Sequence, residues 1–289
     1  MDFQEDRILK EYVKFNQNKQ IITKDYIKRF LLTYINILGY QSYVSNIVVH
    51  NNGTSFAVYT ADHTLSIRYM TIIEYAKKRY GINEIKTIYD AININNEIIK
   101  VLFHELTHIK QKIDMNNKNI NPLIKDVISA YKLFKDKQIK VDNNVHIYNK
   151  IKLLKDGGFK LEKLDVVNNE KNLYKKYHDF FPYEYNANLE GLLNLIEFEK
   201  KAGLINIDYQ TKNLYLFLLT SYITNPFGVK SPQETIYELK GEKLDISKYE
   251  CLTNYERILY GLPINNQTYQ KIMDLRKEKQ INFKEYWGK

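Results

Sequence analysis

Apolar residues recur at the spacing of one helix face in three parts of the chain. Residues 5–38 predict two amphipathic helices with a break near residues 16–18. Residues 71–80 predict a third helix, which Gly81 ends. The longest segment of this kind, residues 95–112, contains no glycine or proline. Its apolar positions form one stripe: Ile98, Leu102, Leu106, Ile109 and Ile113.

A stretch before the longest helix instead shows the alternation of a half-buried strand. Residues 56–59 and 65–69 are rich in β-branched and aromatic side chains and predict a β-hairpin. Residues 47–49 predict a third strand. We therefore expect an α+β fold that is mostly helical, with a small antiparallel or mixed sheet before the longest helix.

The rest of the chain is expected to be helical. Residues 122–137 predict a helix, and two glycines at 157–158 predict a break. From Leu204 onward another helical region is predicted. Glycine and proline turns punctuate that region at residues 225–228, 231–232 and 260–263.

Length and composition suit one large domain or two subdomains. The chain has 289 residues, of which 44% are hydrophobic, so it can bury a substantial core. We expect an N-terminal helical segment over residues 1–40 and a core over residues 41–203. A helical C-terminal region over residues 204–289 is expected to pack on that core.

Charge and targeting signals narrow the range of partners. The net charge is +9, but the lysines are spread along the chain and no nucleic-acid-binding motif is present. Nucleic acid is therefore not the expected partner. Cys251 is the single cysteine, so a disulfide scaffold is excluded. No apolar run resembles a secretion leader or a membrane span, so we expect a cytoplasmic protein with no membrane partner.

The longest predicted helix carries an H-E-x-x-H motif formed by His104, Glu105 and His108. Positions four apart on a helix lie on the same face, so the two imidazoles can bind one metal ion. Glu105 is rotated by roughly 100° from His104, which suits it to act on a water molecule rather than on the metal. The motif therefore predicts a hydrolytic site with one zinc ion per chain.

A third ligand must come from outside the motif. Asp114 would need a glycine at position 111 to turn back, but that residue is Gln111. On a continuing helix Asp114 lies about 9 Å along the axis from His108. Glu184 is the better candidate, because Pro182 starts a new helix and places Glu184 in its first turns. The alternatives that remain are Glu162, Glu170 and Glu190.

The motif at residues 104–108, followed far downstream by Glu184-x-x-Ala187-Asn188, resembles the gluzincin branch of the zincin metallopeptidases. Thermolysin-like members of that branch carry Glu-x-x-x-Asp on the second helix. The resemblance covers roughly residues 45–200 and implies a zincin-like fold. It implies that Glu184 is the third zinc ligand and that Asn188 orients a ligand histidine. An asparagine oxygen can accept an imidazole N–H, although it adds no charge.

The predicted function is a zinc metallopeptidase that hydrolyses peptide bonds of a protein or peptide substrate. Zinc lowers the pKa of its bound water, and Glu105 acts as general base and then protonates the leaving amine. An oxyanion also needs a donor. The eligible side chains include His178, Tyr177 and Tyr174, together with the C-terminal tyrosines. The edge strand of the small sheet would bind the extended substrate by backbone pairing, as in zincin-like folds.

Two other function classes stay open. In the first, zinc only stabilises a protein-interaction module in which the site is not catalytic. In the second, the basic chain binds nucleic acid without hydrolysis. Glu105 separates the first from a peptidase, because a structural site would not need it. The sequence does not predict the substrate specificity or the oligomeric state.

Overall fold

The computed structural model describes residues 3–116, 125, 148–153, 159–163, 182–204, 214, 217–218, 221–225, 228–239, 242–265 and 267–268. The chain divides into two compact units. The first comprises Met1–Asn116 and Glu190–Gln210, and the second comprises Asn117–Leu189 and Thr211–Lys289. Helix α7 (Pro182–Lys201) is continuous and contributes residues to both units.

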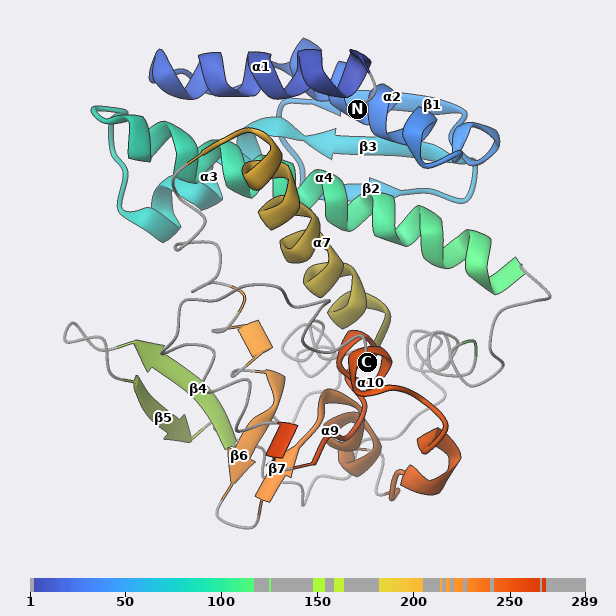
Figure 1. Cartoon of the computed structure of the whole chain (residues 1–289). Coiled ribbons are helices and arrows are strands. Elements are labelled where there is room, and N and C mark those ends of the chain that lie inside the picture. The colour runs from blue at the N-terminus through green and yellow to red at the C-terminus, as the bar shows by residue number, and fades with distance from the viewer. Residues whose placement is uncertain are drawn as a thin grey trace. The chain divides into compact units, whose positions relative to one another are not determined.

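The first unit combines helices with one small sheet (Figure 1). Its elements before α7 are α1 (Phe3–Gln17), α2 (Lys24–Ile37), the short 3-10 helix η1 (Gln41–Tyr43), β1 (Asn46–His50), β2 (Ala57–Tyr59), β3 (Thr64–Arg68), α3 (Tyr69–Tyr80) and α4 (Ile88–Asn116). The α+β prediction is confirmed, including the break between the first two helices and the three strands. Within the described ranges no helix is both long and apolar enough to cross a membrane.

The sheet is mixed and has the order β1-β3-β2. Strand β1 pairs with β3 in parallel, and β2 pairs with β3 antiparallel as the predicted hairpin. The central strand β3 buries Leu65 and Ile67 completely. Strand β2 therefore forms one edge of the described sheet, and α4 packs against it.

Helix α4 is longer than its apolar stripe predicted, because a capping arrangement starts it earlier. The backbone N–H of Asp90 donates to Thr87 Oγ1 at 3.1 Å, and Asp90 Oδ2 accepts from the Thr87 N–H at 2.8 Å. This reciprocal pair satisfies N–H groups that the first turn of a helix leaves without partners. The helix begins at Ile88 and runs to Asn116.

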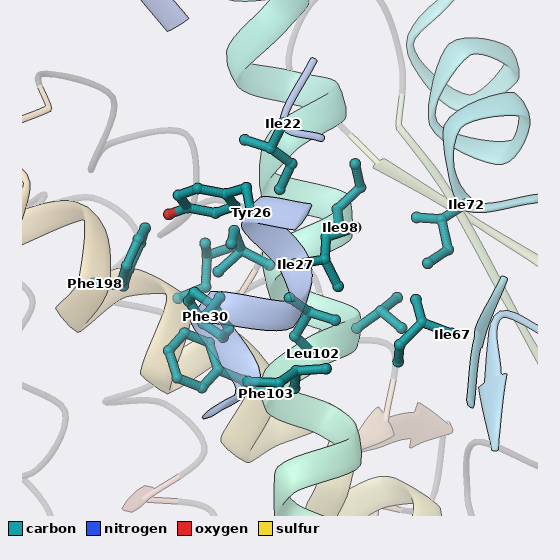
Figure 2. Packing of buried hydrophobic residues seen from close by; sticks show 14 of the residues in the cluster. Ile22, Tyr26, Ile27, Phe30, Ile67, Ile72, Ile98, Leu102, Phe103 and Phe198 are labelled. Atoms are coloured by element: carbon teal, nitrogen blue, oxygen red, sulfur yellow. The ribbon is translucent and has the colours of Figure 1, made fainter. Parts of the chain in front are cut away.

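Aromatic side chains from α2, α4 and α7 form the centre of the core (Figure 2). Phe30 of α2 lies edge to face with Phe103 of α4 and Phe198 of α7, with ring centroids 5.2 and 5.6 Å apart. Edge-to-face pairs of this kind add to the stabilisation from burial. The core therefore fixes the second part of α7 against α4.

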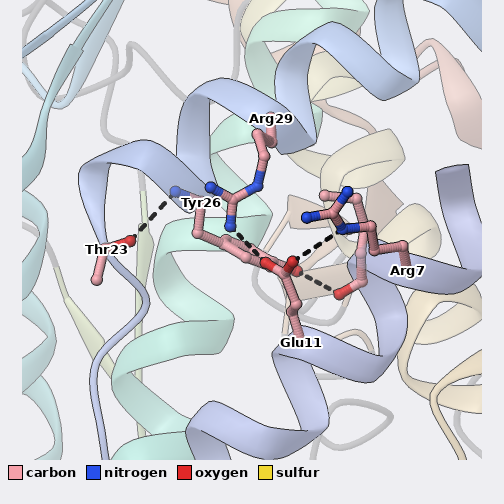
Figure 3. Close-up of polar contacts among 6 residues, drawn as sticks. Arg7, Glu11, Thr23, Tyr26 and Arg29 are labelled. Atoms are coloured by element: carbon pink, nitrogen blue, oxygen red, sulfur yellow. Dashed lines mark hydrogen bonds and ion pairs between the residues drawn. The ribbon is translucent and has the colours of Figure 1, made fainter.

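Polar contacts join α1 to α2 at the surface of the first unit (Figure 3). Glu11 accepts from Arg7 at 3.3 Å and from Arg29. Tyr26 is fully buried and donates its hydroxyl to the Ile8 carbonyl oxygen at 3.0 Å. Exposed ion pairs contribute little, so the buried hydroxyl and the apolar contacts hold these helices together.

The second unit contains more strands than we expected. The hairpins β4 (Tyr148–Leu153) with β5 (Phe159–Lys163) and β6 (Ile223–Asn225) with β7 (Gly228–Lys230) are both antiparallel. The predicted helical region after residue 204 therefore differs at β6 and β7, where strands flank the predicted turn at residues 225–228. Its Asn-Pro-Phe-Gly segment joins two strands, for which the β-branched Ile223 and Thr224 are suited. The predicted helix at 122–137 and break at 157–158 lie outside the described residues.

The other elements described in this unit are helices. Its remaining described elements are α9 (Pro232–Leu239), the 3-10 helix η3 (Ile246–Tyr249) and α10 (Asn254–Leu259). The first turns of α7 are anchored within it, because Tyr185 stacks on Phe217 at 5.3 Å and Asn186 Nδ2 donates to the Leu259 carbonyl oxygen at 3.0 Å.

A buried polar cluster lies where α1, α4 and α7 meet in the first unit. Tyr12 donates its hydroxyl to Asn96, whose Nδ2 donates to Glu199 Oε1 at 2.6 Å. Asn95 Nδ2 donates to Asn16 Oδ1 at 2.7 Å beside them. Glu199 is 0% exposed, and this burial raises the pKa of its carboxyl group to about 8. Glu199 is therefore protonated in the folded protein at neutral pH.

This raised pKa makes the free energy of unfolding depend on pH. In the unfolded chain the carboxyl ionises near its ordinary pKa of 4.5, whereas in the folded chain it stays protonated up to about 8. Stability should therefore fall as the pH rises from about 4.5 to about 8 and level off above that range. We expect Glu199→Gln to remove this slope and to stabilise the protein by several kcal/mol at pH 8.

Urea unfolding of the full chain at pH 5, 6.5 and 8 measures this effect. Glu197→Gln is the matched control, because Glu197 lies on the same helix with 63% of its side chain exposed. Parallel pH profiles for the wild type and Glu199→Gln would contradict the prediction.

Candidate metal centre

Three side chains from α4 and α7 come together as a group that could hold a metal ion. His104, His108 and Glu184 each offer one ligand atom, and these atoms lie within 4.8 Å of one another. They are the three residues that the sequence predicted as metal ligands. No other group of three such residues is present among those that the structure describes.

The local structure of α4 explains how the histidines are presented. Their rings are 4.5 Å apart between centroids and nearly perpendicular, at 88°. The opposite stripe of α4, which includes Ile98, Leu102 and Ile109, is fully buried in the core. Core packing therefore fixes the rotation of the helix about its axis and directs both imidazoles to the same side.

Close packing of α7 on α4 depends on a glycine. If Gly191 carried a Cβ atom, that atom would lie 3.1 Å from the Lys100 carbonyl oxygen and 3.3 Å from the His104 backbone nitrogen. Glu184 precedes Gly191 by two turns of the same helix. The glycine thus lets α7 approach the backbone of the motif helix beside His104, and helical continuity carries Glu184 to the histidines.

The donor set suits a small divalent cation. Ligands at about 2.1 Å from a tetrahedral zinc ion are about 3.4 Å apart. The three ligand atoms lie within 4.8 Å, so modest rotations of the side chains bring them to that spacing. Glu184 is only 7% exposed, which means that its carboxylate is shielded from bulk water beside two imidazoles. Two nitrogens and one carboxylate oxygen would leave one position of a tetrahedral ion open to a water molecule.

A hydrogen bond orients one of the histidines. His108 Nδ1 lies 2.8 Å from Gln111 Oε1, and both residues are buried. Asn188, which the resemblance assigned to orienting a histidine, is half-buried and forms no hydrogen bond with His104 or His108 among the described residues. The sequence places Gln111 on the same helix face as the histidines, and its position three residues after His108 was a usable signal for this contact, which was not predicted.

The other acidic residues near α4 do not join the metal-binding group. Lys110 Nζ lies 3.9 Å from Glu190. Asp114 is half-buried, and this burial raises the pKa of its carboxyl group. Burial and the charges of Asp114 and Glu190 raise the pKa of Tyr40 to about 12, which places the three residues near one another. The structure therefore groups Glu190 with Asp114 and Tyr40, and none of the three belongs to the metal-binding group.

Glu105 lies on a different side of α4 from the histidines. It is 5% exposed. Lys112, seven positions later and so on the same side of the helix, places its ammonium 4.9 Å from the ring centroid of Tyr59 on β2. By helical phase, Glu105 therefore faces the side of α4 that packs against the edge strand.

Several predicted site residues cannot be placed. The oxyanion candidates His178, Tyr177 and Tyr174 lie outside the described residues, as does the alternative ligand Glu170. Glu162 belongs to β5. The assignment of an oxyanion donor therefore stays a prediction.

The close approach at Gly191 yields a test of how the centre is held. Gly191→Val would place a branched side chain against the backbone of α4, so we expect a loss of about 1–3 kcal/mol in stability. The metal affinity should fall as well, because α7 must move away from the histidines. Asn194→Val, on the exposed side of α7, is the control. Urea unfolding and metal titration measure the two effects, and a Gly191→Val protein that binds metal like the control would refute the explanation.

Comparisons with known proteins give no indication of the function. The chain matches no protein family, no curated protein and no solved structure. What the arrangement can do must therefore be inferred from the positions of His104, Glu105, His108 and Glu184.

Proposed function

We propose that the protein is a zinc-dependent metallopeptidase. The observation that carries this proposal is the convergence of Glu184 with the two motif histidines, which precede it by 80 and 76 positions in the sequence. An H-E-x-x-H motif that occurred by chance would not be expected to lie beside a buried carboxylate from another helix. Two imidazoles and one carboxylate are also the protein ligands of a known class of catalytic zinc sites.

The residues of the chain have separate roles in this proposal. His104, His108 and Glu184 would hold the ion, which would supply an acidic water and polarise the substrate carbonyl. Glu105 accepts the proton of the attacking water and delivers it to the amine that leaves. Its place on the same helix, one position after a ligand, keeps it near the reacting water without occupying a coordination position.

The edge strand supports a peptide as the substrate. Strand β2 pairs on one side with β3 and forms an edge of the described sheet, and Val58 at its centre is 38% exposed. Backbone groups of an edge strand can pair with an extended peptide. Because α4 packs against β2 with Glu105 on the facing side, a peptide paired with β2 would run past the proposed general base.

Glu105 separates a peptidase from a non-catalytic zinc protein. We expect Glu105→Gln to retain one zinc ion per chain and to lose about 10²- to 10⁴-fold in hydrolysis, because the amide cannot accept the proton. Metal content by elemental analysis and cleavage of a diverse peptide library by mass spectrometry measure these effects. The control is Glu74→Gln, at an exposed position of α3. Undiminished cleavage by Glu105→Gln would remove this residue from its role.

Glu184 is tested separately through the metal itself. We expect Glu184→Ala to bind zinc at least 100-fold more weakly, because only the two histidines remain as protein ligands. Zinc should raise the melting temperature of the wild type and have little effect on this variant. Glu190→Ala is a matched control on the same helix and should keep both properties. Equal zinc content in Glu184→Ala and the wild type would reject the ligand assignment.

A further inference from the structure

We infer that Gln111 is a positioning residue that fixes the imidazole of His108 as its Nδ1–H tautomer and so presents Nε2 to the metal. This inference rests on the proposed metal centre and identifies a residue that neither the motif nor the resemblance assigns. The supporting contact is the 2.8 Å hydrogen bond between His108 Nδ1 and Gln111 Oε1.

The chemistry of the two groups determines which atom carries the proton. An amide oxygen only accepts hydrogen bonds, so the ring nitrogen that faces it must donate. With the proton on Nδ1, the neutral imidazole has its free electron pair on Nε2. That nitrogen is then the one available as a metal ligand.

Because this contact is buried, it restricts both the tautomer and the orientation of the His108 ring. Gln111 is 2% exposed and His108 is 8% exposed, so water has little access to replace the amide oxygen. An imidazole ring rotates about a broad χ2 torsion, which a single buried hydrogen bond can hold in place. The bond therefore sets both the tautomer and the plane of the ring before any metal binds.

The course of α4 makes the contact possible. Residues three apart on a helix are neighbours, and α4 continues past Gln111 to Asn116. A glycine at position 111 that ended the helix would remove the acceptor. The helical continuation that excludes Asp114 as a ligand therefore supplies the partner of His108.

The neutral amide also limits the negative charge near the centre. Glu105 and Glu184 are already buried there, at 5% and 7% exposure. A third carboxylate beside His108 would strengthen the basicity of the ligand once a cation is bound, but it would repel the other two in its absence. Gln111 thus orients the ring without adding to this repulsion.

Two substitutions separate the orienting contact from simple packing. Gln111→Leu removes the acceptor and keeps an apolar side chain of similar length, so zinc affinity should fall about 10- to 100-fold. Gln111→Glu keeps an acceptor and cannot donate, so zinc affinity should equal or exceed that of the wild type. If the amide instead donated its N–H₂ to Nδ1, glutamate would weaken binding as leucine does, and this result would overturn the inference.

Zinc affinity is measured by competition with a chromogenic chelator, and the tautomer of His108 by ¹⁵N NMR of the metal-free full chain. The wild type and Gln111→Glu should show the Nδ1–H tautomer, and Gln111→Leu should lose this preference. Asp114→Asn and Asn194→Leu are controls on α4 and α7 that should leave both readouts unchanged.

The outcomes distinguish this inference from the proposed function. Tight zinc binding by the wild type with no change in Gln111→Leu would overturn the role of Gln111 alone. No zinc binding by the wild type would refute the metal centre and the presentation of Nε2 together. A metal centre confirmed by Glu184→Ala but inactive toward peptides would refute the peptidase and leave the role of Gln111 standing.

Discussion

The crossing of α7 over α4 is the constraint on which the candidate metal centre depends. Gly191 lets the two backbones approach until a Cβ atom would lie 3.1 Å from the Lys100 carbonyl oxygen. The aromatic contacts of Phe198 with Phe30, and of Phe30 with Phe103, hold the same pair of helices further along α7. A carboxylate distant in the sequence reaches the histidines because this crossing is close and rigid.

Helix α4 combines two tasks on separate faces. Its apolar stripe fills the core, and this packing determines where the other side chains point. The histidines occupy one side, Glu105 occupies the side toward β2, and Asn96 reaches Glu199 toward α7. The candidate site and the stability of the fold are therefore coupled, because a change that rotates the helix would move the candidate ligands, the proposed base and the core residues together.

Local periodicity explains what the sequence could predict. The stripe from Ile98 to Ile113 identified α4, alternation identified the three strands, and Pro182 marked the start of α7. The candidate ligands followed, since H-E-x-x-H and a helix-start glutamate are readable without any tertiary information. Their convergence was a hypothesis, because no local pattern encodes the distance between two helices.

Features that depend on tertiary context were missed. The early start of α4 comes from the reciprocal pair of Thr87 and Asp90, and the hydrogen bond between Gln111 and His108 was not predicted. The strands β6 and β7 were too short to be distinguished from breaks in a helical region, with three residues each. Whether short strands and buried polar contacts form also depends on neighbours that are remote in the sequence, so local patterns alone do not predict them.

The burial of α4 on nearly every side has an evolutionary consequence. From Ala91 to Ile109 every residue is buried or half-buried, so this part of the helix has no face on which substitutions would leave the packing unchanged. Substitutions along this segment should then be rare even at positions that do not belong to the candidate metal centre. Related chains should therefore keep α4 more constant than α1, where several positions are exposed.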